Sequence, residues 1–164
     1  MNYELFVRSG SQEVDFALLK DGKLIELHKE EEDNDFTVGD IYLAKIRKIV
    51  PGLNAAFVNV GYEKDAFLHY LDLGVKVKTM NSFVTKAIEK SKKTITHFPN
   101  EPLINKSGRI SDVLTGGQKI LVQIAKESIS TKGPRITTEI SIAGRYVVLV
   151  PFGDRISISQ KIKN

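Results

Sequence analysis

The fold of this chain is decided by residues 41–69, which read IYLAKIRKIVPGLNAAFVNVGYEKDAFLH. Apolar and polar residues alternate from Ile41 to Ile49, again from Leu53 to Val60, and briefly from Ala66 to His69. A period of two is typical of strands with one buried face, and the Pro51-Gly52 pair between the first two segments marks a turn. The stretch therefore predicts three consecutive short strands.

Strand patterns also occur in the first 35 residues. Leu5 to Arg8 begins one strand, and the segments Val14 to Leu19 and Leu24 to Leu27 flank an Asp21-Gly22 pair. An Asp-Gly pair supplies the positive-φ positions that a tight hairpin needs, so these residues predict a β-hairpin. The acidic run Glu30 to Asp35 that follows has no apolar anchor, and we interpret it as a linker or loop between two structural units.

Further strands are expected in the second half of the chain. Lys119 to Lys126 is strand-like and follows a Gly116-Gly117 turn signal. Ile136 to Ile142 and Tyr146 to Val150 predict a second hairpin around Ala143-Gly144. Short strands with a long excursion before the last one or two suggest a small barrel. We therefore expect a mainly β chain that contains a five-stranded barrel.

Residues 74–109 have a different pattern. Eight basic residues fall within this segment, and its apolar residues have helical spacing. We expect a short helix near Phe83 to Lys92, capped by Asn81 or Ser82. The pattern indicates an insertion rather than a core element, and its basic helix is either a solvated surface or a binding surface.

The composition excludes several kinds of site. The sequence has no cysteine, which excludes disulfides, thiolate metal sites and cysteine nucleophiles. Its longest apolar runs are too short to span a bilayer, and its first residues lack the basic start and apolar core of a signal peptide. We therefore expect a cytoplasmic protein without a membrane partner.

Charge is distributed unevenly along the chain. The formal net charge is +4, but residues 1–40 carry eleven acidic and four basic residues, which leaves 20 basic and nine acidic residues in the remainder. A basic excess of this size suits a polyanionic partner, because neutralising phosphates releases counterions and so drives binding. A generally solvated basic surface explains the same numbers, and charge alone does not decide between the two.

The stretch 39–69 resembles the OB-fold RNA-binding domain first described in ribosomal protein S-one. In that family the first strand is followed by a Pro-Gly turn, by a Phe-Val strand that ends in glycine, and by a Phe-Leu-His strand. Ala44 and Ala66 stand where the family usually has glycine. Both are small, so we expect close backbone packing to survive.

The flanking residues extend the resemblance to ribonucleases E and G. The matching segments are residues 53–58 (LNAAFV), 117–127 (GQKILVQIAKE) and 132–151 (KGPRITTEISIAGRYVVLVP). In that family the OB domain interrupts a ribonuclease H-like subdomain. The resemblance therefore implies an OB domain at residues 36–127, with an insertion at about 74–109. Residues 1–35 and a truncated 128–164 would then form the two parts of the ribonuclease H-like subdomain.

Phe57 and Phe67 match the nucleotide-stacking aromatic residues of the family. Their neighbours Val58 and Leu68 must point the other way, into the barrel, because side chains alternate along a strand. A phenylalanine on the outer face of a small barrel can stack on a base, which is worth roughly 1–3 kcal/mol per base. The alternative is a core phenylalanine, which is the commoner position for this residue type.

The remaining candidate RNA-binding residues are basic. His69 lies two residues after Phe67 and hence on the same face, where it can stack or contact phosphate, or have no role. Lys126 and Lys132 match basic positions that the family places beside the aromatic residues, and Lys45 can extend the same strip. The alternative for each lysine is a solvated side chain.

No catalytic residue or cofactor is expected in this segment. Family members cut RNA with Mg²⁺ held by aspartates of a downstream nuclease domain, whereas Asp65, Asp112 and Asp154 are isolated in this sequence. The resemblance implies that the segment is inactive alone, that Mg²⁺ belongs to that downstream domain, and that homo-oligomers form only in the full-length parent protein.

The resemblance thus implies single-stranded RNA binding, as the substrate-holding part of a ribonuclease E/G-type endoribonuclease of RNA processing and decay. Two other functions stay open. One is a free-standing, non-enzymatic RNA-binding or translation-associated protein, although such proteins usually carry tandem OB repeats and none is visible here. The other is an OB barrel that contacts a protein partner, since fold alone does not determine function.

Overall fold

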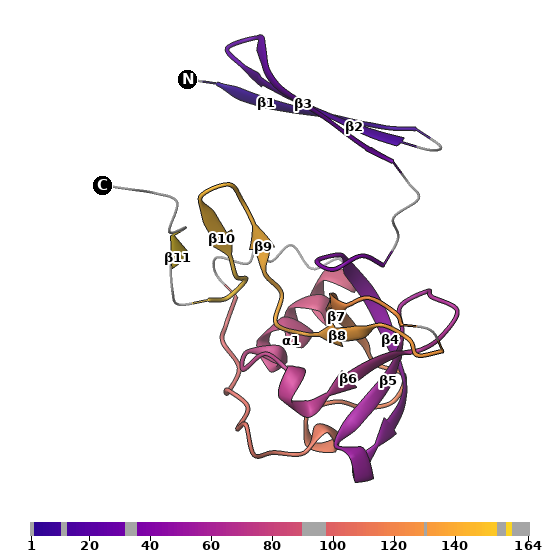
Figure 1. Cartoon of the computed structure of the whole chain (residues 1–164). Coiled ribbons are helices and arrows are strands. Elements are labelled where there is room, and N and C mark those ends of the chain that lie inside the picture. Colours follow the sequence, from indigo (N-terminus) through magenta and orange to yellow (C-terminus); the bar gives the residue numbers. More distant parts are fainter. Residues whose placement is uncertain are drawn as a thin grey trace. The chain divides into compact units, whose positions relative to one another are not determined.

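The computed structural model describes residues 2–10, 13–31, 36–89, 98–129, 131–153 and 157–158 (Figure 1). The chain divides into two compact units, Met1–Asp35 and Phe36–Asn164. Each unit is described by itself.

The first unit is a three-stranded antiparallel sheet. Its strands are β1 (Tyr3–Ser9), β2 (Glu13–Lys20) and β3 (Lys23–Glu31), in the order β1-β2-β3. The turn between β2 and β3 has φ 49° at Asp21 and φ 78° at Gly22. Positive φ at both central residues is the geometry of the tightest hairpin turns, so the predicted hairpin is confirmed. Residues 32–35 of the predicted acidic linker lie outside the described residues.

The second unit contains a closed five-stranded barrel. Its strands are β4 (Ile41–Val50), β5 (Ala55–Asn59), β6 (Ala66–His69), β7 (Lys119–Lys126) and β8 (Arg135–Thr137). They close in the order β4-β5-β6-β8-β7, and every pairing is antiparallel except that of β6 with β8. A five-stranded barrel of this connectivity is consistent with the predicted OB fold.

The barrel core is formed by alternate residues of its strands, as the period of two predicts. Apolar side chains that are fully or almost fully buried come from all five strands: Ala44, Ile46, Ala56, Val58, Ala66, Leu68, Ile120, Val122, Ile124 and Ile136. Ala44 and Ala66, at positions where the S-one family usually has glycine, are among these buried residues, so a methyl group is accommodated at both.

The fifth barrel strand lies beyond the expected end of the OB domain at residue 127. Ile136 is fully buried and pairs with Ile124, so the segment that was predicted to begin a second hairpin instead closes the barrel. The hairpin itself is shorter than predicted. It joins β9 (Ile142–Ala143) to β10 (Val147–Leu149), and β11 (Ser157–Ile158) completes a small sheet in the order β11-β10-β9.

The helix also differs from its prediction. Helix α1 spans Val77–Ile88, so it begins six residues and ends four residues earlier than expected. Its N-cap is Lys76, which makes no side-chain capping bond. Asn81 and Ser82, the predicted caps, lie inside the helix. Part of the predicted insertion therefore belongs to the core. Among the described residues no helix is long and apolar enough to cross a membrane.

The buried face of α1 carries Val77, Met80 and Val84, which are spaced at three and four residues. Val77 joins the barrel core, while Met80 and Val84 pack in a second cluster with Ile140. A surface insertion would bury none of these side chains. Their burial stabilises α1 against the rest of the unit, although the basic composition of the segment had indicated a surface element.

Asn54 fastens the loop after α1 to the end of the barrel. This residue ends the 3-10 turn η1 (Pro51–Leu53) with φ 47° and ψ 43°. Its side-chain amide donates to the Gly108 carbonyl oxygen at 3.1 Å, and its side-chain oxygen accepts from the Ile110 N–H at 2.7 Å. Ile110 is fully buried in the barrel core, so this N–H depends on Asn54 for its hydrogen bond.

Asn54→Ala is expected to destabilise the chain by about 2–4 kcal/mol, because it orphans a buried N–H and places a Cβ-bearing residue without a local hydrogen bond in the left-handed region. Urea unfolding followed by circular dichroism measures this change. Asn54→Gly keeps the backbone conformation but loses the same bonds, so its stability should lie between the two. An Asn54→Ala variant as stable as the parent chain would contradict the stabilising role of these two hydrogen bonds.

Candidate nucleic-acid interface

One row of side chains crosses the outer face of the barrel. In the paired strands, Lys48 of β4 lies opposite Phe57 of β5, and Phe57 lies opposite Phe67 of β6. The row continues from Phe67 to Arg135 of β8 and ends at Lys126 of β7. Neighbouring strands lie about 5 Å apart, so the row is a continuous strip of two aromatic and three basic side chains.

The two phenylalanines point outward. Val58 and Leu68 have no exposed surface, which confirms the prediction that they face the barrel interior, whereas Phe57 and Phe67 are half-buried. The two rings have centroids 5.9 Å apart and meet edge to face at 67°. The His69 ring lies 6.5 Å from that of Phe67 and is nearly parallel to it, at 27°. Three ring faces therefore meet on β5 and β6.

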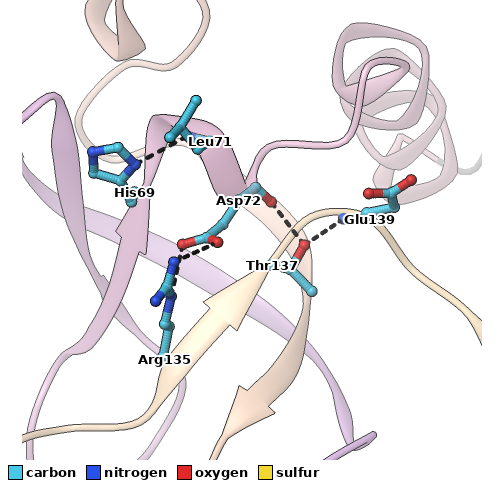
Figure 2. Close-up of polar contacts among 6 residues, drawn as sticks. All are labelled: His69, Leu71, Asp72, Arg135, Thr137 and Glu139. Atoms are coloured by element: carbon cyan, nitrogen blue, oxygen red, sulfur yellow. Dashed lines mark hydrogen bonds and ion pairs between the residues drawn. The ribbon is translucent and has the colours of Figure 1, made fainter. Parts of the chain in front are cut away.

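The orientation of His69 is set by the backbone. Its Nδ1 accepts a hydrogen bond from the Leu71 N–H at 3.1 Å, which caps the 3-10 turn η2 (Tyr70–Asp72) (Figure 2). Because Nδ1 is an acceptor, the neutral ring carries its proton on Nε2. The ring thus presents a defined face and a donor toward solvent.

Two β-bulges place the ends of the row. The pairing of β4 with β5 shifts between Ile46 and Lys48, and that of β7 with β8 shifts between Ile124 and Lys126. An extra residue in one strand re-aims the side chain that follows it. Ile46 and Ile124 therefore stay buried while the next paired residues, Lys48 and Lys126, are exposed beside the aromatic pair.

The loop from β7 to β8 forms one wall of a hollow beside the phenylalanines. Within this loop Gly133 lies so close to β6 that a Cβ would approach the Asp65 carbonyl oxygen to 2.2 Å. The next residue, Pro134, accepts a hydrogen bond from the Phe67 N–H at 2.8 Å. The hollow measures about 740 Å³ and is lined by Phe57, Lys64, Asp65, Phe67, Thr131, Lys132, Gly133 and Arg135.

The structure brings most of the predicted site residues together. Phe57, Phe67 and His69 share one face, and Lys132 lines the hollow beside them. Lys126 is at the end of the row rather than in the hollow. Lys45 is exposed but lies off the row, where it pairs with Asn59 on one side and with Lys119 on the other.

Arg135 was not predicted as a site residue. Its Nε and one Nη donate to the two carboxylate oxygens of Asp72 at 3.0 and 2.8 Å (Figure 2). These hydrogen bonds, and then the opposite charge, raise the pKa of the Arg135 guanidinium above its ordinary value. The arginine stands in the recognisable segment 132–151, but its place beside Phe67 follows from the parallel pairing of β6 with β8, which no local pattern encodes.

Comparison with known proteins gives the family. No protein-family model matches the sequence. The chain is 32% identical to ribonuclease G of Haemophilus influenzae over 161 residues, which cover 98% of this chain and 29% of that protein. It is 32% identical to ribonuclease G of Escherichia coli over 164 residues, 100% of this chain and 30% of that protein.

The chain is also similar to ribonuclease E of a Nostoc species. The two are 38% identical over 129 residues, which cover 77% of this chain and 15% of that protein. The chain is a homologue of the N-terminal segment of ribonucleases G and E. The chain spans about 30% of the length of the ribonuclease G relatives that it matches. In its described residues no three histidine, aspartate or glutamate side chains are grouped as metal ligands.

Gly133→Ala is expected to displace the β7–β8 loop, because the added methyl group overlaps the Asp65 backbone. The variant should lose about 1–3 kcal/mol of stability, the range for overpacking a tight contact. The matched control is Gly116→Ala, since a Cβ there meets no atom within 4 Å. Urea unfolding of both variants tests the contact, and equal midpoints for the two would contradict it.

Proposed function

We propose that this chain binds single-stranded RNA across the outer face of β5 and β6. The observation that carries the proposal is the outward pair Phe57 and Phe67, which meets its basic neighbours in one row. In OB barrels the face of the second and third strands and the loops beside it bind oligonucleotides. Here β5 and β6 are those strands, and the β7–β8 loop is one of those loops.

Stacking supplies the contact to the bases. Every base has an apolar face, so an exposed ring gains about 1–3 kcal/mol per stacked base with little regard to sequence. Burying both phenylalanines in the core instead would leave Val58 and Leu68 outside, which is the reverse of what the strand alternation gives. We therefore assign Phe57 and Phe67 to two successive bases, with His69 as a further stacking or phosphate-contacting side chain.

Lysines supply the contact to the phosphates. Lys126 and Lys132 extend from the β7 end of the row and from the loop beside it, and Lys48 stands at the opposite end. A lysine acts as a point charge, and each phosphate it neutralises releases counterions. Lys45 lies two residue pairs away from the row, beyond the Ile46–Val58 pair, so it is assigned a peripheral contact.

We propose further that this binding holds an RNA substrate for a ribonuclease in RNA processing and decay in the cytoplasm. The named relatives are ribonucleases, and the chain matches less than a third of ribonuclease G. Bond cleavage, and the Mg²⁺ expected for it, are assigned to the part of such proteins that this chain does not match. The segment contributes affinity and orientation of the strand rather than chemistry.

The test separates the two contributions. Phe57→Ala/Phe67→Ala should weaken binding of a labelled single-stranded RNA by about 1–3 kcal/mol per lost stack, with the salt dependence unchanged. Lys126→Ala/Lys132→Ala should instead reduce the slope of log K against log[salt] by about 1.4, the value for two phosphate contacts to a single strand. Fluorescence anisotropy at several salt concentrations measures both quantities.

Phe6→Ala and Lys106→Ala are the matched controls, since Phe6 is an exposed phenylalanine of the first unit and Lys106 an exposed lysine outside the row. Neither should change binding. Salt-sensitive binding that the phenylalanine substitutions leave unchanged would favour a basic surface that contacts an acidic protein partner. Binding that none of the four substitutions at Phe57, Phe67, Lys126 and Lys132 affects would contradict the proposed face.

A further inference from the structure

Arg135 is the fourth side chain of the outer row and lies between the aromatic pair and Lys126. It pairs with Phe67 on one side and with Lys126 on the other, and it lines the same hollow as Phe57 and Phe67. A single strand that follows the two phenylalanines across the barrel toward Lys126 therefore passes over Arg135. The side chain at this position decides what the next nucleotide meets.

The guanidinium is held in a fixed plane. Asp72 binds it through two parallel hydrogen bonds of 3.0 and 2.8 Å, which fixes both the position and the tilt of the fork. Asp72 is itself fixed, because its carbonyl oxygen accepts from the Thr137 hydroxyl at 2.7 Å (Figure 2). The same oxygen accepts from the Thr138 N–H at 3.1 Å. The Arg135–Asp72 clasp therefore joins the start of β8 to η2, and the hydrogen bond from Thr137 joins the end of β8 to the same residue.

Stability alone is a weak reason for this pair. The Arg135 side chain is 46% exposed and that of Asp72 is 18% exposed, and partly exposed ion pairs contribute about 0–1 kcal/mol. The fork uses two of the five guanidinium N–H groups, and both donate to Asp72, which is the hydrogen-bond partner of Arg135 in the described part of the chain. One plane and three donors are left for a ligand.

The pairing also changes what Arg135 can offer to a polyanion. With Asp72 alongside, the site has no net charge, so it attracts phosphate much less than Lys126 or Lys132 does. A guanidinium plane remains a good surface for an unpaired base, as arginine planes are in single-stranded RNA recognition. Because Asp72 already fixes the guanidinium, stacking a base on it costs less conformational entropy.

We propose that Arg135 is a third base-stacking element of the face, that it takes the nucleotide beyond those on Phe57 and Phe67, and that Asp72 is its positioning residue. This inference rests on the proposed RNA binding and extends the platform from two bases to three. The ligand class is an unpaired base of a single strand, recognised by its face and not by its phosphate.

The experiment compares Arg135→Lys and Asp72→Asn with the parent chain by anisotropy, using a labelled oligouridylate of about ten nucleotides. Arg135→Lys keeps the charge but loses the plane, and it should weaken binding on the order of tenfold with an unchanged salt slope. Asp72→Asn removes an acid from a site for a polyanion, yet it should also weaken binding, because the guanidinium loses its orientation.

An oligomer of equal length without bases separates stacking from charge. The Arg135→Lys effect should vanish on this abasic strand, whereas the loss caused by Lys126→Ala should persist on it. The matched control pair is Arg8→Lys and Asp15→Asn, since Arg8 and Asp15 also form an arginine–aspartate ion pair, 3.8 Å apart, on paired strands outside the barrel. These two variants should bind like the parent chain.

Tighter binding by Asp72→Asn, or an equal loss with Arg135→Lys on normal and abasic strands, would show that Arg135 is an ordinary cation and would overturn the inference. If Phe57→Ala/Phe67→Ala weakens binding but Arg135→Lys does not, the inference fails while the proposed function stands. If the parent chain does not bind the RNA, both fail.

Discussion

The outer face of the barrel depends on the seam between β6 and β8. There the Phe67 N–H donates to the Pro134 carbonyl oxygen, and Gly133 lies directly against the Asp65 backbone. This parallel pairing closes the barrel, because β6 and β8 are the neighbours that complete its circle. The same contacts place residues 131–133 of the β7–β8 loop next to the phenylalanines, so the pairing that closes the barrel also forms one wall of the site.

The seam explains why the site combines side chains from distant parts of the sequence. Asp72 and Arg135 are separated by 63 residues, and α1 and β7 lie between them in the sequence. Asn54 ties Gly108 and Ile110 of this stretch to the barrel end. The stretch ends at β8, which pairs with β6 through Arg135 and Phe67.

Much of the architecture follows from local patterns. The alternation around Val58 and Leu68 identifies the buried and outward faces of β5 and β6, and Asp21-Gly22 identifies a hairpin turn, because both signals act over a few residues. The position of β8 and the start of α1 could not be predicted in this way. Three residues of strand carry little periodic signal, and the helix is set by burial of Val77 in a core made elsewhere.

The candidate site divides along the same line. Phe57, Phe67, His69 and Lys132 come from motif and alternation, and the structure places them together. The places of Lys48 and Arg135 in the site could not be predicted from the sequence. The bulge at residue 47 decides which lysine of β4 faces Phe57, and the clasp with Asp72 arises from long-range pairing. Side chains whose placement depends on such pairings are those that local reasoning misses.

The ring resonances of phenylalanine report most directly on whether RNA lies on the Phe57–Phe67 face. Carbon–proton spectra of the phenylalanine-labelled chain, recorded during titration with a single-stranded oligoribonucleotide, distinguish this face from the Phe83–Phe98–Phe152 cluster beside α1. If RNA lies on this face, the Phe57 and Phe67 ring signals will shift while those of the cluster stay in place. Saturation with RNA that leaves the Phe57 and Phe67 signals unshifted would contradict binding on this face.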